Sequence, residues 1–449
     1  MLSRVLAFVL VTLSCGLTMG AEWPTFRGPD HTGVAPDSDP PIEWDEKTNV
    51  RWKIELEGSG HASPVVWGNR IFVMSAIKTE KEVESGRNQP PDSVLLASQQ
   101  PPQQQRRQRP PRVKPTQAHQ FIVSAHDLET GKRVWKTVVR EEVPHESLHS
   151  TASQVSASPV TDGKHIWAFF GSRGLYCLDM GGKIQWKAEF GTQTTRNEFG
   201  EGASPAVHGD SVVVNWDHEG DSFIAALDKK TGKERWRVAR DEPTSWSTPL
   251  VLRDGERDVV VISATSRVVG YDLASGEEIW SVSGLGVNAI PTPVADDETV
   301  WVMSGYRDPR GMAIRYRGAK GDLTGTDRVS WETERGLSYV PSAVLVDGKI
   351  FFFQRFTGIL SCHELTGGKP CYDQQRIDGY EDIYASPVAS NGRVYSVSRD
   401  GTAVVFSAGD EFKILARNEL DDVFNATPAI VGGALILRGD RYLYKISRN

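Results

Sequence analysis

The feature that most constrains the fold is a hairpin-like stretch that recurs with turn residues and a tryptophan at fixed offsets. Its clearest copy is ALDKKTGKERW, Ala226 to Trp236. Asp228, Thr231 and Gly232 fit a tight turn, because Gly accepts φ > 0 and Asp can hydrogen-bond backbone N–H groups two residues on. Related copies are AHDLETGKRVW (125–135), GYDLASGEEIW (270–280) and, more loosely, CLDMGGKIQW (177–186). The repeat predicts antiparallel strands joined by locally specified turns.

A second repeated signature is a hydroxyl residue before proline and then an apolar run. Proline suits the first residue of a strand, because it has no N–H to give to a ladder. From Ser158 onward the copies lie 41 to 50 residues apart, and about 40 to 45 residues with four short strands is the spacing of a propeller blade. We therefore predict an all-β, eight-bladed propeller of four-stranded antiparallel blades over residues 50–449. The copies are Ser63-Pro64, Ser158-Pro159, Ser204-Pro205, Thr248-Pro249, Thr292-Pro293, Ser386-Pro387 and Thr427-Pro428, with Ser342-Ala343 as a degenerate member.

The two ends of the repeat region complement one another. NVRWKIEL, which contains Trp52, has the pattern of an outer strand but no inner strands before it, and residues 427–449 end after three strands. We therefore predict that residues 50–56 supply the fourth strand of the last blade, which closes the ring without leaving a free sheet edge. Residues 22–49 carry five prolines and no sustained period, so an extended segment is expected there.

The first 21 residues have the outline of a secretory signal peptide. A charged start precedes an apolar run from Val5 to Leu13, and small residues surround Gly20 and Ala21, where cleavage is expected. A lipid anchor at Cys15 is an alternative, and an uncleaved anchor is another. With a net charge of −7 and 39% hydrophobic residues over its whole length, the chain is typical of a soluble globular protein, and the part after residue 21 is not expected to span a membrane. Export predicts a periplasmic, envelope-associated or secreted location.

Residues 78–119 interrupt the first blade. Their content of Pro, Gln and Arg, as in QQPPQQQRRQRPPRVKP, cannot bury a core, so a disordered or polyproline-like arm is expected. Its basic cluster suits an anionic surface such as a cell-wall polymer or lipid, and a solvated loop without a partner is the alternative. Export and the acidic remainder of the chain argue against a nucleic-acid partner.

The hairpins resemble the repeat of quinoprotein-type propellers. Together with the opening WPTFRGPDHTG and the signal peptide, they are similar to the pyrroloquinoline-quinone-like propeller superfamily, and especially to its smaller BamB-like secreted members. The resemblance implies that a tryptophan packs between adjacent blades and that each turn docks on the neighbouring repeat. The blade tryptophans would be Trp52, Trp135, Trp186, Trp236, Trp280 and Trp331.

The resemblance also raises the question of a cofactor. Enzymes of the superfamily hold pyrroloquinoline quinone (PQQ) at the propeller axis, usually with a calcium ion ligated by Glu, Asn and Asp, and some cap it with a disulfide between adjacent cysteines. This chain has no adjacent pair among Cys15, Cys177, Cys362 and Cys371 and lacks the long insertions of those enzymes. No cofactor is therefore expected, and PQQ with calcium is the alternative. Cys362 and Cys371 flank one turn, and they would either form a cross-strand disulfide or remain two free thiols.

A ligand site is expected where blade-linking loops and the turns between second and third strands meet at one end of the axis. His145 and His149 are four residues apart, but the Pro- and Ser/Thr-rich surroundings predict a loop in which this spacing does not align two imidazoles, so no metal site is expected. Arginines at several turns would either face an anionic ligand as a ring or stay solvated. The candidate funnel comprises His145, His149, Arg173, Asp217, His218, Trp246, Arg267, Arg307, Arg355 and Arg399.

The sequence shows no Gly-x-Ser-x-Gly elbow, phosphate loop or Cys-x-x-Cys pair. We therefore expect an exported, monomeric, non-catalytic scaffold that binds a protein or a cell-envelope polymer. The alternatives are a PQQ-dependent oxidoreductase and a carbohydrate-active enzyme without a recognised motif.

Overall fold

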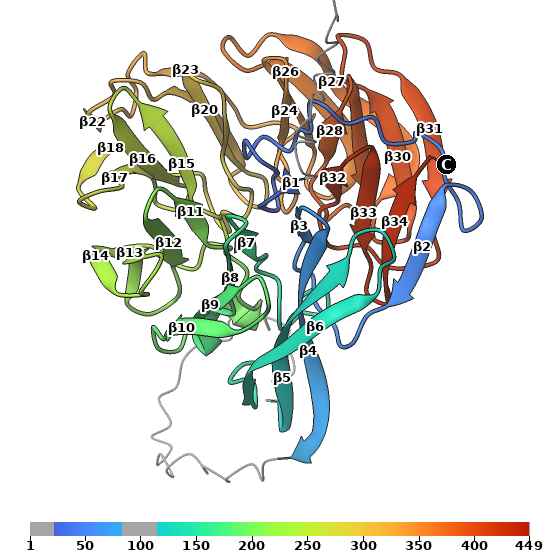
Figure 1. Ribbon diagram of the computed structural model, residues 1–449. Coiled ribbons are helices and arrows are strands. Elements are labelled where there is room, and N and C mark those ends of the chain that lie inside the picture. Colours follow the sequence, from blue (N-terminus) through green and yellow to red (C-terminus); the bar gives the residue numbers. More distant parts are fainter. Residues whose placement is uncertain (1–21, 83–114, 449) are drawn as a thin grey trace, which may run out of the picture.

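The structure is a computed structural model that describes residues 22–82 and 115–448. Eight sheets surround a common axis, with their first strands facing the centre (Figure 1). In the described residues the only helical turns are two short 3-10 segments, η1 (Gly171–Arg173) and η2 (Arg196–Glu198). The predicted eight-bladed β-propeller is confirmed. The signal peptide, the anchor alternatives at Cys15 and most of the predicted arm lie outside the described residues.

The first four blades follow the chain from the inside outward. Two of them carry a fifth strand: β1 joins the inner edge of the first blade, and β22 joins the outer edge of the fourth in parallel. The strands are β1 (Glu22–Trp23), β3 (Val65–Trp67), β4 (Arg70–Glu82), β5 (Gln117–Asp127) and β6 (Arg133–Glu142); β7 (Val160–Thr161), β8 (His165–Phe169), β9 (Leu175–Asp179) and β10 (Ile184–Ala188); β11 (Ala206–His208), β12 (Ser211–Trp216), β13 (Ser222–Asp228) and β14 (Glu234–Arg240); β15 (Leu250–Asp254), β16 (Arg257–Ile262), β17 (Arg267–Asp272), β18 (Glu278–Ser283) and β22 (Gly321–Asp322).

The last four blades have four strands each, all antiparallel. They are β19 (Val294–Ala295), β20 (Thr299–Ser304), β21 (Arg310–Arg315) and β23 (Val329–Thr333); β24 (Val344–Val346), β25 (Lys349–Phe353), β26 (Thr357–Glu364) and β27 (Pro370–Glu381); β28 (Val388–Ser390), β29 (Arg393–Val397), β30 (Thr402–Ser407) and β31 (Ile414–Glu419); β32 (Ala429–Val431), β33 (Ala434–Arg438), β34 (Tyr442–Ser447) and β2 (Val50–Glu55).

The ring closes between the two ends of the repeat region. β2 pairs antiparallel with β34, from Val50 opposite Ile446 to Glu55 opposite Tyr442, so the N-terminal strand completes the eighth blade as predicted (Figure 1). Trp52 and Ile54 pack against the apolar cluster of that blade. The closure leaves β34 without an exposed edge.

The repeated turns dock on the tryptophan of the preceding blade. In the third blade, the Asp228 carboxylate accepts the N–H groups of Lys230 and Thr231 and the Thr231 hydroxyl, which fixes the turn and lowers the pKa of Asp228. Gly232 has φ +69°, and a Cβ there would lie 2.5 Å from the Trp186 ring. The Trp186 indole N–H donates to the carbonyl of Lys229 across the blade boundary (3.1 Å). Local turn chemistry thereby sets the contact between neighbouring blades.

Five of the six blade tryptophans make this contact, and Trp280 does not. The indoles of Trp52, Trp135, Trp186, Trp236 and Trp331 donate to the carbonyls of Leu128, Met180, Lys229, Leu273 and Leu365. Trp280 instead lies over Gly270 of its own sheet, and its Nε1 has no partner among the described residues. The reason is that the fifth blade replaces the compact turn by a longer connection that carries β22.

The predicted arm begins and ends at different residues from those expected. β4 continues to Glu82 and β5 starts at Gln117, with Lys78 opposite His119 and Glu82 opposite Gln117. The expectation of an arm over 78–119 was therefore wrong at both ends, because the hairpin ladder extends beyond the apolar run that marked the strands in the sequence. The Thr79 hydroxyl, which donates to the carbonyl of Ala118, adds a side-chain contact to this extension.

The hydroxyl–proline signature forms a closed ring of hydrogen bonds around the axis. Each backbone N–H of the signature residue donates to the side-chain hydroxyl of its counterpart in the next blade, over distances of 2.8 to 3.3 Å, and Thr427 donates to Ser63 to complete the circle. We call these residues the hydroxyl ring: Ser63, Ser158, Ser204, Thr248, Thr292, Ser342, Ser386 and Thr427. The signature thus joins neighbouring blades and does not merely begin strands.

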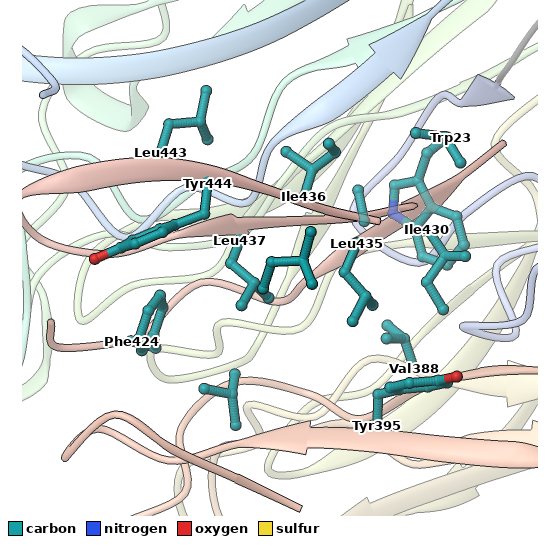
Figure 2. Close-up of a cluster of buried hydrophobic side chains, with 14 of the residues drawn as sticks. Trp23, Val388, Tyr395, Phe424, Ile430, Leu435, Ile436, Leu437, Leu443 and Tyr444 are labelled. Atoms are coloured by element: carbon teal, nitrogen blue, oxygen red, sulfur yellow. The ribbon is translucent and has the colours of Figure 1, made fainter. Parts of the chain in front are cut away.

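The N-terminal segment enters the axial channel and turns back within it. Glu22 lies opposite Trp67, beside the β3–β4 turn, and Asp39 hydrogen-bonds to Asn391 at the β28–β29 turn, so both ends of the segment lie at the same face of the ring. Between them, Trp23 is fully buried and packs with Ile430 of the eighth blade (Figure 2). Residues 22–39 therefore fill the channel from the face that carries the repeated turns between third and fourth strands.

Cys362 and Cys371 are free thiols in the structure, so of the two alternatives it contains the thiols and not the disulfide. Cys362 lies opposite Tyr372 in the β26–β27 ladder, and burial raises the pKa of its thiol. Cys177 is a buried core residue, as expected. Within the described residues, none of the elements is a helix long and apolar enough to cross a membrane.

Candidate functional site

A cavity of about 440 Å³ lies on the axis at the loop face, the face formed by blade-linking loops and by turns between second and third strands. This volume falls within the range of about 300 to 1,000 Å³ typical of small-molecule sites. All eight residues of the hydroxyl ring line it, and Phe26, at the tip of the N-terminal segment, contributes to its floor. The axial cavity is therefore built by every blade together with the segment that fills the channel.

Aromatic side chains form the cavity wall in two arcs. The first arc, from the fifth, sixth and seventh blades, stacks Tyr306 on Tyr339 (ring centroids 4.8 Å apart) and Phe356 on Tyr384 (6.0 Å). The second arc pairs Phe199 with Trp246 (6.4 Å), and the Trp246 indole N–H donates to the carbonyl of Gly200, which fixes the ring. Because the second arc belongs to the second, third and fourth blades, the two arcs lie in different halves of the eight-membered ring.

Among the described residues, those that line the cavity include no Asp, Glu, Lys or Arg; the titratable side chains of the lining are His61, His149, Tyr306, Tyr339 and Tyr384. His61 lies 3.6 Å from Asp440. Burial, together with the nearby Arg438 and Arg399 guanidiniums, outweighs that carboxyl group and lowers the pKa of His61 to about 3. His61 is therefore neutral at physiological pH.

A buried cation lies behind the cavity floor. Arg27 is fully buried, and its guanidinium donates to the carbonyls of Pro387 (2.9 Å), Ala343 (2.6 Å) and Thr32 (3.3 Å). Burial lowers the pKa of Arg27 to about 9. Gly33, with φ +85°, is needed beside it, because a Cβ there would lie 2.3 Å from an Arg27 nitrogen. Since Pro387 and Ala343 directly follow members of the hydroxyl ring, the cation lies next to that ring.

The low pKa of His61 predicts that the folded protein loses stability as the pH falls. The folded-state pKa of about 3 is below the ordinary value of 6.5, so the unfolded chain takes up a proton that the folded chain does not as pH falls below 6.5. The free energy of unfolding should fall by about 3 kcal/mol on this account between pH 6.5 and pH 4. The variant His61→Gln should lose less stability over this interval in urea denaturation series. Equal losses in the two proteins would contradict the assignment.

Comparison with known proteins places this ring of blades in a family. A family model described as outer membrane protein assembly factor BamB matches residues 119–374, which is more than half of the chain. The chain belongs to the BamB family. It is 24% identical to the outer membrane protein assembly factor BamB of Yersinia pestis over 340 residues, covering 71% of this chain and 77% of that protein.

Solved dehydrogenase structures share the fold of this BamB-family chain. A europium-containing methanol dehydrogenase matches with a TM-score of 0.60 and 11% identity, covering 94% of this chain and 90% of that one. The quinohemoprotein alcohol dehydrogenase from Comamonas testosteroni matches with a TM-score of 0.60 and 12% identity, covering 94% of this chain and 80% of that one. At these identities the likeness concerns the fold alone.

The axial cavity does not fit a quinone held by calcium. Calcium takes six to eight oxygen ligands, usually with several carboxylates. In the described parts of the chain, the cavity lining offers the amide of Asn425 but no Asp or Glu. Among the residues that the structure describes, no group of three or more His, Cys, Asp or Glu is placed to hold a metal ion. The donor set therefore gives no support to cofactor chemistry of this type.

Two of the ten predicted funnel residues, His149 and Trp246, line the axial cavity of this BamB-family propeller. His149 contacts the Thr151 hydroxyl (2.9 Å) and the edge of Phe199. His145 contacts the carbonyl of Gln193 (2.7 Å), so the two histidines have different partners. His218 is buried, and its Nδ1 accepts the N–H groups of Thr194 and Gly220.

Asp217 holds two blades together. It forms a buried ion pair with Arg240 (2.8 Å) and accepts the Ser245 hydroxyl (2.7 Å), while Arg240 also donates to the Tyr271 hydroxyl of the fourth blade (2.8 Å). Both charged side chains are almost inaccessible to solvent. This predicted funnel residue therefore belongs to an interblade network.

The structure does not gather the predicted arginines in the cavity. Arg173 is buried against Glu201, Arg267 pairs with Glu278 on the neighbouring strand, and Arg399 pairs with Asp382. Arg307 stacks on the Tyr306 ring (5.4 Å), and Arg355 is an exposed turn residue with φ +55°.

Two of the cavity residues that the sequence analysis missed are direct neighbours of predicted funnel residues. Tyr306 precedes Arg307 and Phe356 follows Arg355, and in each pair the aromatic residue lines the cavity. Tyr339, Tyr384, His61 and the hydroxyl ring were also missed as site residues. The available signal was the aromatic residue beside Arg307 and beside Arg355, in turns where a buried core does not require an aromatic side chain.

Proposed function

We propose that this BamB-family propeller is a non-catalytic binding scaffold of the cell envelope, and that its partner binds at the axial cavity on the loop face. The observation that carries the proposal is a cavity walled by aromatic rings and hydroxyls, with no Asp, Glu, Lys or Arg among the lining residues that the structure describes. Such a lining offers apolar area and hydrogen bonds, which are the means of binding.

The same lining does not pair its ring hydroxyls with a base. An activated hydroxyl nucleophile needs an adjacent base within hydrogen-bond reach. Within the described part of the chain, none of the eight ring hydroxyls contacts a histidine or a carboxylate; each accepts a backbone N–H instead. The geometry therefore favours a scaffold over a hydrolase or a quinone-dependent dehydrogenase.

The family also supports a place in the envelope. The relative from Yersinia pestis is named as an outer membrane protein assembly factor, and the proposal extends a binding role to this chain as an exported, monomeric protein. Its partner would be a protein or a cell-envelope polymer.

Retention of envelope components by immobilised protein tests the proposal. The double variant Tyr339→Ala/Phe356→Ala removes the centre of the first arc and should lose the components that the wild-type protein retains. Val134→Ala is the matched control, because Val134 is also exposed (46% against 37% for Phe356) but lies on β6 outside the cavity. Retention that survives the double variant would refute the proposed site. Dye reduction by protein loaded with PQQ and calcium would refute the non-catalytic role.

A further inference from the structure

The hydroxyl ring carries eight donors that the protein itself does not use. Each hydroxyl oxygen accepts a backbone N–H of the preceding blade, yet among the described residues none of the eight O–H groups donates to a protein acceptor. The eight side chains belong to residues that are only 3 to 8% exposed, and all of them line the axial cavity. A Ser or Thr hydroxyl has one O–H donor besides its acceptor lone pairs, so the ring can donate to acceptor atoms that enter the cavity.

The positive charge of Arg27, behind the cavity floor, favours acceptor atoms of a ligand at this position. Arg27 contacts the carbonyls of Ala343 and Pro387, next to Ser342 and Ser386 of the ring, and no carboxylate among the described residues pairs with it. A cation in a medium of low dielectric constant raises the local potential, which favours the negative end of a ligand dipole. Oxygen atoms of a ligand should therefore point toward the floor.

The aromatic wall of the cavity imposes a second requirement on the ligand. Tyr306, Tyr339, Phe356 and Tyr384 form one arc, and Phe199 and Trp246 form the other. Aromatic faces bind flat apolar surfaces and gain little from an isolated polar group. A ligand that fits both wall and floor needs an apolar face as broad as a ring and, at its edge, several oxygen atoms.

The absence of charge in the lining imposes a third requirement. An ionised ligand would lose its hydration shell in the cavity, and the 24 lining residues include no Arg or Lys to compensate an anion and no Asp or Glu to compensate a cation. The Arg27 nitrogens Nη1 and Nη2 already donate to carbonyls. The ligand should therefore be uncharged.

We infer that the axial cavity binds a neutral saccharide, whose pyranose face stacks on an aromatic arc while its hydroxyl and ether oxygens accept from the hydroxyl ring. The inference rests on the proposed binding role and specifies its ligand class. It makes the hydroxyl ring a recognition element as well as a joint between blades.

Calorimetric titration with cellotriose, maltotriose and chitotriose tests the inference, with trigalacturonate as the charged counterpart. At least one neutral trisaccharide should bind, quench Trp246 fluorescence and bind more tightly than trigalacturonate. Tyr339→Ala should weaken that binding about tenfold or more, and Val134→Ala should leave it unchanged. Binding of none of the neutral probes, or tighter binding of trigalacturonate, would overturn the inference.

A matched pair of variants separates the hydroxyl from the shape of its side chain. Thr292→Ser keeps the hydroxyl and should retain saccharide affinity, whereas Thr292→Val keeps the shape and should lower it about threefold to tenfold. Equal affinities of two folded variants would overturn the role of the ring. The outcomes also separate the two proposals: retention of an envelope partner that depends on Tyr339 and Phe356, without saccharide binding, would leave the scaffold intact and remove only the ligand class.

Discussion

Deleting residues 50–56 should open the propeller at the joint between the eighth and first blades. Trp52 packs against the eighth blade and donates to the carbonyl of Leu128 in the first, so its truncation alone should cost about 3 kcal/mol. The deletion should cost more, because β34 also loses its partner strand. Hydrogen exchange should show lost protection in β34 and at the β5–β6 turn before it is lost in the fourth or fifth blade.

Glu55→Ala provides the control for this deletion. Glu55 is an exposed residue at the end of the same strand, and its substitution should change the free energy of unfolding by less than about 0.5 kcal/mol. Trp52→Ala and Glu55→Ala proteins of equal stability, or a deletion protein with unchanged protection in β34, would contradict closure by this strand.

Asp217→Ala should be the most damaging single change among the predicted funnel residues. It leaves the Arg240 guanidinium buried without its carboxylate, and breaking a buried ion pair in this way costs about 3 to 5 kcal/mol. The double variant Asp217→Ala/Arg240→Met should recover most of the loss, because it removes the uncompensated charge. Urea denaturation of the single and double variants measures both effects.

Arg267→Ala is the matched comparison. Arg267 also forms an ion pair, with Glu278, but both side chains are more than a third exposed, so its loss should cost at most about 1 kcal/mol. If Asp217→Ala and Arg267→Ala cost the same, or if the double variant is no more stable than Asp217→Ala, the buried network does not hold the blades as described.

The fold was predictable because its determinants are local. The Asp228 turn needs only its own four residues and a glycine, and each such turn places a hairpin. The spacing of the hydroxyl–proline signature then gives the number of blades. The closure of the ring was predictable from the lone strand at residues 50–56 and the incomplete last blade, because the backbone groups of an unpaired strand can hydrogen-bond to an unpaired sheet edge.

The candidate site was less predictable because side-chain direction depends on partners in other strands. Arg267 begins β17, and its direction is set by Glu278 across the ladder. Asp217 and Arg240 are 23 residues apart and meet only when the third blade folds. Trp246 was found because it lies in a blade-linking loop, whereas Phe356 and Tyr306 were passed over for the neighbouring arginines.

The hydroxyl–proline signature was recognised but only half understood. Proline explained why a strand begins there, but the N–H and hydroxyl of the preceding residue find their partners 41 to 50 residues away across most blade boundaries. A closed ring of such bonds exists only after all blades are in place, and it therefore cannot be derived from one repeat.

Site-specific photocrosslinking in the native cell envelope tests the binding role most directly. A photoreactive phenylalanine analogue at Phe356, on the rim of the axial cavity, should form a defined adduct with an envelope component, and the same analogue at Val134 on β6 should not. An adduct at Val134 with none at Phe356, or the same adducts at both positions, would contradict the assignment of the loop-face cavity as the binding site.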